Sequence, residues 1–179
     1  NLIIEHLCGL ISENKKKKGR VIDVNNALDG DGPFSPERSG SLPVGQLIKM
    51  CFSEQYTFDE MDNMIKGKGG LVAYLNTNDA YEVELKVRAG DKKAKCIQEA
   101  LCYQVAKEIG SMSAVLEGQV DAIILTGGIA HNPLVVDYIR SKVRFIAPVA
   151  IYPGEDEMHA LAENGLRVLK GETKPLQYE

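Results

Sequence analysis

The sequence predicts an α/β fold in which a mixed sheet with crossover helices is interrupted by a helical insertion. Three observations support this prediction: strand-like and helix-like segments alternate in the last third of the chain, helical periodicity dominates the middle, and short β-branched segments lie near the start. The chain has 179 residues, 44% of them hydrophobic, which suffices for one domain with its own core.

The beginning of the chain predicts two strands and a long loop. Leu2 to Ile4 and Arg20 to Val24 are apolar and β-branched, and we interpret them as a hairpin. The lysine run between them, Lys15 to Lys18, fits a solvated turn better than an anion site. Asn25 to Gly40 is rich in Gly, Pro and carboxylates and has no apolar period, which predicts a long shaped loop of the kind that is commonly functional.

The middle of the chain, from Leu42 to Ala114, has the apolar spacing of several helices. Thr57 stands three residues before Glu60 and is an expected N-cap. Asp79 closes a polar segment and is the expected N-cap of a helix over residues 80–87. The longest helix is expected from Asp91 to about Leu116, and it should cross the core.

The last third of the chain alternates between strands and helices. Val120 to Leu125 and Phe145 to Ile151 are the expected strands, and Asn132 to Val143 and Glu155 to Leu169 are the expected helices. This order predicts mostly parallel strands joined by crossover helices.

Composition excludes several classes of function. Lys and Arg number 21 and Asp and Glu 25, and the resulting net charge of -4 argues against a nucleic-acid partner or a polybasic membrane anchor. No apolar stretch approaches the roughly 20 residues that a membrane span needs, and no export leader is recognisable, so we expect a soluble cytoplasmic protein without a membrane partner. The four cysteines lack C-x-x-C spacing and are expected to be reduced, and the three histidines lack zinc-site spacing.

Two glycines join a buried strand to a helix in the segment from Leu125 to Asn132. Ligands of open α/β sheets bind at the carboxyl ends of strands, and the first amides of a helix attract anions. Gly127 and Gly128 therefore fit a nucleotide site. They fit equally well a tight turn that needs a positive φ.

Two charged clusters are further candidates. Arg38 ends the glycine-rich loop, and its planar guanidinium suits a phosphate group, although an exposed, solvated arginine is the commoner outcome. Glu155 and Glu157 follow the second expected strand, where a carboxylate either helps to hold Mg²⁺ or favours the dipole of the next helix.

Taken together, these segments resemble the butyrate kinases of the acetokinase family, which belongs to the sugar kinase, heat-shock-protein and actin superfamily. The resemblance runs from about His6 to the end of the chain. It rests on motifs at Gly19 to Gly30, Gly32 to Gly40, Leu71 to Leu75 with Thr77 to Asp79, Leu125 to Asn132, and Tyr152 to Met158.

The resemblance implies a ribonuclease H-like (actin-like ATPase) fold and a homo-oligomer that uses ATP and Mg²⁺ to phosphorylate a short-chain carboxylate such as butyrate. It implies that Arg38 and His6 act on the transferring phosphoryl group, and that one carboxylate at Glu155 to Glu157 serves the metal. The residues that it places around the adenosine are Gly127, Gly128, Ile129, Asn132 and Asp79. On this hypothesis Arg38 and the two glycines face the same triphosphate.

The sequence also departs from the family pattern. The second phosphate loop of the family reads His-Leu-Gly-Gly-Gly-Ile-Ser, whereas Cys8 and Leu10 replace two of its glycines here, and we expect their side chains to obstruct a phosphate. Tyr81 stands where the family pattern leads us to expect an arginine that covers the adenine.

The resemblance assigns residues 1–172 to a C-terminal acyl-kinase-like domain and 173–179 to a tail, and the N-terminal kinase domain with its own phosphate loop is expected to be absent. Two hypotheses follow. The chain is either part of an acyl kinase with weak ATP binding and slow or absent turnover of its own, or a non-catalytic module for nucleotide binding or dimerisation.

Overall fold

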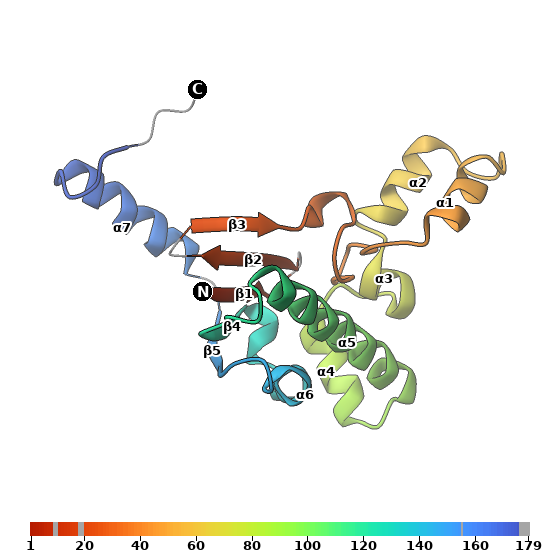
Figure 1. Ribbon diagram of the computed structural model, residues 1–179. Helices are drawn as coiled ribbons and strands as arrows, with labels where there is room; N and C mark the ends of the chain where they lie inside the picture. Colours follow the sequence, from red (N-terminus) through yellow and green to blue (C-terminus); the bar gives the residue numbers. More distant parts are fainter. Residues whose placement is uncertain (9–10, 18–19, 155, 176–179) are drawn as a thin grey trace.

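The structure is a computed structural model that describes residues 1–8, 11–17, 20–154 and 156–175. Within these residues the strands form one five-stranded sheet in the order β3-β2-β1-β4-β5 (Figure 1). Strands β1 (Leu2–His6), β4 (Ala122–Gly127) and β5 (Val149–Pro153) are parallel to one another. Strands β2 (Ser12–Lys17) and β3 (Arg20–Val24) extend the sheet in antiparallel pairing. The predicted mixed sheet is confirmed.

The hairpin expected between Leu2 to Ile4 and Arg20 to Val24 is wrong. The lysine-rich strand β2 lies between these segments and pairs with both of them. Ladder pairing uses backbone groups, so a lysine-rich segment can pair without an apolar alternation of side chains, and every residue of the neighbouring strand β3 is exposed. Lys17 of β2 is also exposed and lies 3.8 Å from Glu117. The solvated turn expected over Lys15 to Lys18 is wrong for Lys15, Lys16 and Lys17, which belong to β2, and Lys18 lies outside the described residues.

The predicted helical insertion is confirmed. Thr57 caps the helix α2 (Phe58–Ile65), and its side chain and that of Glu60 form a reciprocal capping box, which satisfies two backbone donors at the start of the helix. None of the helices in the described part of the chain has the length and apolar composition that a membrane crossing requires. The segment comprises α1 (Val44–Cys51), α2 (Phe58–Ile65), α3 (Gly70–Leu75), α4 (Ala80–Arg88) and α5 (Lys92–Val115), after a short 3-10 turn η1 (Ala27–Asp29) in the long loop.

The last third has the predicted order of elements. After β4 come the 3-10 turn η2 (Gly128–His131), α6 (Pro133–Val143), β5 and α7 (Glu157–Leu169). Strand β5 begins later than the expected strand from Phe145 to Ile151. Phe145 and Ile146 remain in the turn that closes α6, where the Ile146 amide donates to the Val143 carbonyl, so pairing starts only at Val149.

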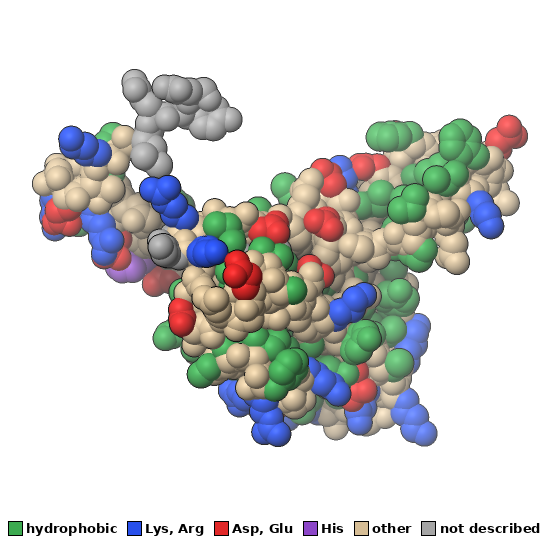
Figure 2. All heavy atoms as spheres, viewed as in Figure 1, with side chains coloured by type: hydrophobic (Ala, Val, Ile, Leu, Met, Phe, Trp, Pro, Cys, Tyr) green, Lys and Arg blue, Asp and Glu red, His purple; other side chains and the backbone are tan. Residues whose placement is uncertain are grey.

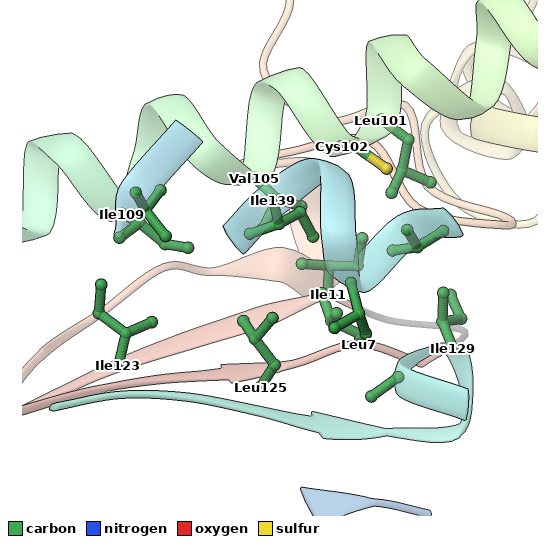
Figure 3. Close-up of a cluster of buried hydrophobic side chains, with 14 of the residues drawn as sticks. Leu7, Ile11, Leu101, Cys102, Val105, Ile109, Ile123, Leu125, Ile129 and Ile139 are labelled. Carbon is green, nitrogen blue, oxygen red and sulfur yellow. The ribbon is translucent and has the colours of Figure 1, made fainter. Parts of the chain in front are cut away.

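The core lies between one face of the sheet and the helices α5 and α6 (Figure 3). Burial alternates along β1 and β4, so Ile3, Ile123 and Leu125 point to the covered face. From the other side come Leu101, Val105 and Ile109 of α5 and Ile139 of α6. Burying one such side chain contributes about 1.5–3 kcal/mol, so this layer fixes the sheet edge described below. The prediction that the longest helix crosses the core is confirmed.

None of the four cysteines takes part in a disulfide bond within the part of the chain that the structure describes. Cys102 of α5 is buried against the core, and this burial raises the pKa of its thiol to about 12. The thiolate is the reactive form, so Cys102 is chemically inert at neutral pH. Its role is packing.

Candidate functional site

The carboxyl ends of β1 and β4 meet at one edge of the sheet. His6 and Thr126 are paired in register, and the chain after β1 continues against the loop after β4. The Leu7 amide donates to the Thr126 carbonyl at 2.7 Å, and the Ile129 amide donates to the Leu7 carbonyl at 2.9 Å. These bonds bring the two predicted ligand loops side by side.

The two glycines of this loop have different environments. Gly127 has a φ of +92°, and a Cβ added to it would overlap the Leu7 carbonyl and lie 2.7 Å from its carbon. A Cβ added to Gly128 would meet nothing within 4 Å. Gly127 is therefore required by the backbone itself, which is the tight-turn interpretation, whereas Gly128 leaves open space for a ligand.

A cavity of about 440 Å³ opens beside Gly128. Its volume is in the range of small-molecule sites, which is about 300–1,000 Å³. The cavity lies between the start of α4 on one side and η2 with the start of α6 on the other. Its lining residues are Cys8, Pro36, Asn78, Asp79, Ala80, Tyr81, Glu84, Gly128, Ile129, His131 and Asn132.

Two capped helix N-termini border this cavity. Asp79 caps α4, and its Oδ1 accepts from the amides of Tyr81 and Glu82 at 2.8 and 3.3 Å. Asn132 caps α6, where its Oδ1 accepts from the Leu134 amide at 2.9 Å. The buried Nδ2 of Asn132 donates to Gln98 of α5 at 3.2 Å, which holds the cap in place. Both helix N-termini therefore border one space, but their caps differ in charge. The Asp79 carboxylate already offsets the positive end of the α4 dipole, whereas the uncharged Asn132 leaves the positive end of the α6 dipole to an anionic ligand.

The loop that carries Arg38 is fastened to the start of α3. The Ser35 amide donates to the Arg38 carbonyl at 3.1 Å, and the Arg38 amide donates to the Ser35 hydroxyl at 3.1 Å. The Leu71 and Val72 amides donate to the carbonyls of Ser35 and Pro36, both at 3.1 Å. The loop is therefore a fixed part of the fold and not a solvated coil.

The Arg38 side chain is half-buried, and its Nε donates to no acceptor in the part of the chain that the structure describes. A buried donor without an acceptor costs free energy, which an anionic oxygen would recover. Pro36 lines the cavity, but Arg38 is not among the lining residues. That Arg38 and Gly128 face the same ligand stays a prediction.

His6 and Cys8 stand at the end of β1. The Cys8 Sγ lies 3.8 Å from the His6 Nδ1, and Cys8, but not His6, lines the cavity. The side chain that replaces a family glycine therefore forms part of the cavity wall. Gly9 and Leu10 are outside the described residues, so the expected obstruction of a phosphate stays a prediction.

The carboxylates proposed for the metal follow β5. The backbones of Gly127 and Gly154 bond to each other in both directions, at 3.2 and 3.0 Å, so the acidic segment starts at the same sheet edge as the glycine loop. Glu155 and the side chain of Glu157 lie outside what the structure describes. No group of three or more potential metal ligands occurs among the described residues. Magnesium bound to phosphates needs only one or two protein carboxylates, so the donor chemistry of this segment fits it.

The structure adds cavity residues that the sequence analysis did not single out. Glu84 lies one turn after Ala80 on α4, and both line the cavity. Asp79 was a recognisable N-cap, and the spacing of four residues from Ala80 places Glu84 on the same helix face. This helical spacing was the signal in the sequence that could have identified Glu84 as a cavity residue. The contact of Gln98 with Asn132 joins segments 34 residues apart, and no local pattern indicates it.

Comparison with known proteins agrees with this geometry. The model of the acetokinase family matches residues 1–159. The chain is 58% identical to butyrate kinase 1 of Clostridium acetobutylicum over 179 residues, and 57% identical to a probable butyrate kinase of Clostridium botulinum over 178 residues. The match covers 100% and 99% of this chain and 50% of each relative, so the chain spans about half the length of these relatives.

Solved structures show the same fold. Acetate kinase of Porphyromonas gingivalis superposes with a TM-score of 0.83 at 20% identity, over 94% of this chain and 49% of that one. A propionate kinase of Francisella tularensis gives 0.78 at 23% identity, over 88% of this chain and 47% of that one. A ROK hexokinase of Thermus thermophilus gives 0.54 at 16% identity, over 96% of this chain and 58% of that one. The predicted actin-like ATPase fold is confirmed, and the chain belongs to the acetokinase family.

Proposed function

We propose that this chain contributes the adenosine side of an active site that transfers a phosphoryl group from ATP to a short-chain carboxylate such as butyrate. The observation that carries the proposal is the cavity between the N-termini of α4 and α6, at the carboxyl ends of β1 and β4. High identity to butyrate kinases supports the choice of acceptor.

Each nominated residue has a role that suits its position. Asp79, Ile129 and Asn132 border the cavity and would surround the adenosine, and Gly128 leaves space for the phosphates. Arg38 would stabilise charge on the phosphoryl group while the bond to the β-phosphate breaks and a bond to the carboxylate oxygen forms. His6 would donate a hydrogen bond to the same group.

Magnesium would be held by phosphate oxygens together with one carboxylate of Glu155 or Glu157, and it would neutralise charge on the phosphates. Beyond this charge stabilisation, the protein contributes to catalysis by positioning the reacting groups. Phosphoryl transfer depends on several parts acting at once, and the chain spans about half of the relatives that it matches. We therefore propose that the isolated chain binds ATP weakly and turns over slowly or not at all.

Two measurements on the 179-residue chain test this function. Calorimetric titration with ATP and magnesium is expected to give weak, saturable binding, and an assay that traps acyl phosphate with hydroxylamine is expected to show little product from butyrate.

Replacing Arg38 with alanine should weaken ATP binding about tenfold, because a charge-assisted bond to phosphate is lost. Arg140→Ala, which removes an exposed ion pair with Asp137, is the matched control. Absence of any nucleotide heat would contradict the function, and rapid turnover would contradict the need for further parts.

A second candidate function is a dimerisation module, and an apolar patch favours it. Helices α1 and α2 extend away from the sheet (Figure 1), and Figure 2 shows hydrophobic side chains gathered over them. Phe52 and Phe58 are 84% and 82% exposed, with Val44 and Ile48 exposed nearby in the sequence. Exposed patches of this kind commonly mark protein interfaces.

Sedimentation velocity tests the second candidate. The chain is expected to self-associate, and the double substitution Phe52→Ser with Phe58→Ser is expected to yield monomer. Phe145→Ser is the matched control, because Phe145 is 83% exposed at the end of α6 and outside the patch. A monomeric parent chain, or a double variant that associates as strongly as the parent, would exclude the patch as the contact.

A further inference from the structure

The cavity has one carboxylate that the proposed roles do not use. Glu84 of α4 lines the cavity, and its side chain is 12% exposed. Its Oε1 accepts two hydrogen bonds from Arg88, from Nε at 2.8 Å and from Nη2 at 2.6 Å. Because the two residues are one turn apart on the same helix, the carboxylate is held in a fixed orientation.

The second oxygen of this carboxylate is available to a ligand. Among the hydrogen bonds of the described residues, none uses the Glu84 Oε2, while both bonds from Arg88 end on Oε1. A mostly buried carboxylate oxygen at a cavity wall favours an N–H donor and disfavours a carbonyl or a phosphate. Glu84 therefore gives the cavity one carboxylate oxygen that can accept a hydrogen bond from a ligand.

The two ends of the cavity differ in charge. Gly128 and the amides at the start of α6 form the end that suits phosphates. Glu84 is one turn inside α4, and a negative side chain there repels phosphates and leaves that wall to an uncharged base. Tyr81 is 65% exposed and lies three residues before Glu84 on the same face, which gives the base an aromatic surface to stack on.

We infer that Glu84 selects adenine by accepting a hydrogen bond from its exocyclic 6-amino group at Oε2, while Tyr81 stacks on the ring. Adenine presents an amino donor at this position, whereas guanine and hypoxanthine present a carbonyl oxygen. Guanine presents two adjacent N–H donors at another edge of its ring. A carboxylate that binds both of these donors uses both of its oxygens. Arg88 occupies one of them here, so the site fits a single donor. This inference rests on the proposed nucleotide function of the cavity.

The experiment compares ADP, IDP and GDP binding to the 179-residue chain by calorimetry, with magnesium present. The parent chain is expected to bind ADP at least tenfold more tightly than IDP or GDP, because a carbonyl facing the carboxylate leaves both acceptors unpaired. In Glu84→Gln the amide can also donate, so the preference is expected to fall to about threefold or less. Glu163→Gln is the matched control, since it removes an equivalent Glu–Arg pair, with Arg167, on the exposed helix α7.

The outcomes separate the two proposals. If no nucleotide binds, the proposed function fails and the inference fails with it. If ADP binds and IDP or GDP binds equally well or better, only the inference fails, and this comparison needs no variant. A preference for ADP that persists in Glu84→Gln also overturns the role of Glu84. Loss of the preference in Glu84→Gln, with the preference kept in Glu163→Gln and cooperative melting in both variants, supports it.

Discussion

Replacing Gly127 with alanine is expected to lower the free energy of unfolding by about 3 kcal/mol or more and to abolish measurable nucleotide binding. A side chain at a φ of +92° is strained by itself, and the added methyl group would overlap the Leu7 carbonyl. Leu7 cannot give way without cost, because its amide and its carbonyl bond to Thr126 and Ile129 on the loop in question. The substitution therefore disrupts the contact between β1 and the glycine loop.

Denaturant unfolding measures the first effect, and calorimetry with ATP and magnesium measures the second. Gly128→Ala is the control for stability, because the added methyl group meets nothing within 4 Å. The two variants make the same chemical change at adjacent positions, so composition and unfolded-state entropy are matched. Equal unfolding free energies for the two variants would show that the close approach of Gly127 to Leu7 is not maintained in solution.

Local patterns were sufficient to predict much of this fold. Helix caps such as Thr57 and Asp79 follow from side-chain oxygens that accept from amides two or three residues ahead, so the residues next to each cap contain the information. The alternation of strands and helices after Val120 predicted the parallel strands for the same reason. The strand β2 was missed because its residues carry no apolar alternation, and its pairing with two neighbours is a property of the assembled sheet.

The candidate site divides in the same way. Asp79 and Asn132 were predicted as helix starts, and the structure brings their two helices to one cavity. Whether Glu84 lines that cavity depends on which face of α4 is turned toward the glycine loop, and this is set by tertiary packing of the helix. Arg38 was singled out by its chemistry, but its orientation depends on contacts between the loop and α3, which have no local signal in the sequence.

The contact between the arginine loop and α3 gives the second large expected effect. Gly70 is the first residue of α3, with a φ of +54°, and an added Cβ would overlap the Ser35 carbonyl oxygen and lie 2.7 Å from the Arg38 carbonyl oxygen. Both obstacles are backbone atoms of the loop that carries Arg38, so no side-chain rotation relieves them. Gly70→Ala is expected to reduce the free energy of unfolding by about 3 kcal/mol or more, through left-handed strain together with the displaced loop.

The same substitution also tests whether the loop belongs to the nucleotide site. Pro36 is a wall of the cavity and its carbonyl accepts from α3, so displacing the loop should weaken ATP binding at least tenfold in the fraction that remains folded. Gly45→Ala is the control, because Gly45 lies in α1 and an added methyl group there meets nothing within 4 Å, so stability and affinity should stay near those of the parent. A destabilised Gly70→Ala variant that binds ATP as tightly as the parent would mean that the arginine loop does not shape the nucleotide site. The placement of Arg38 beside the triphosphate would then lose its main support, even with the fold and the family unchanged.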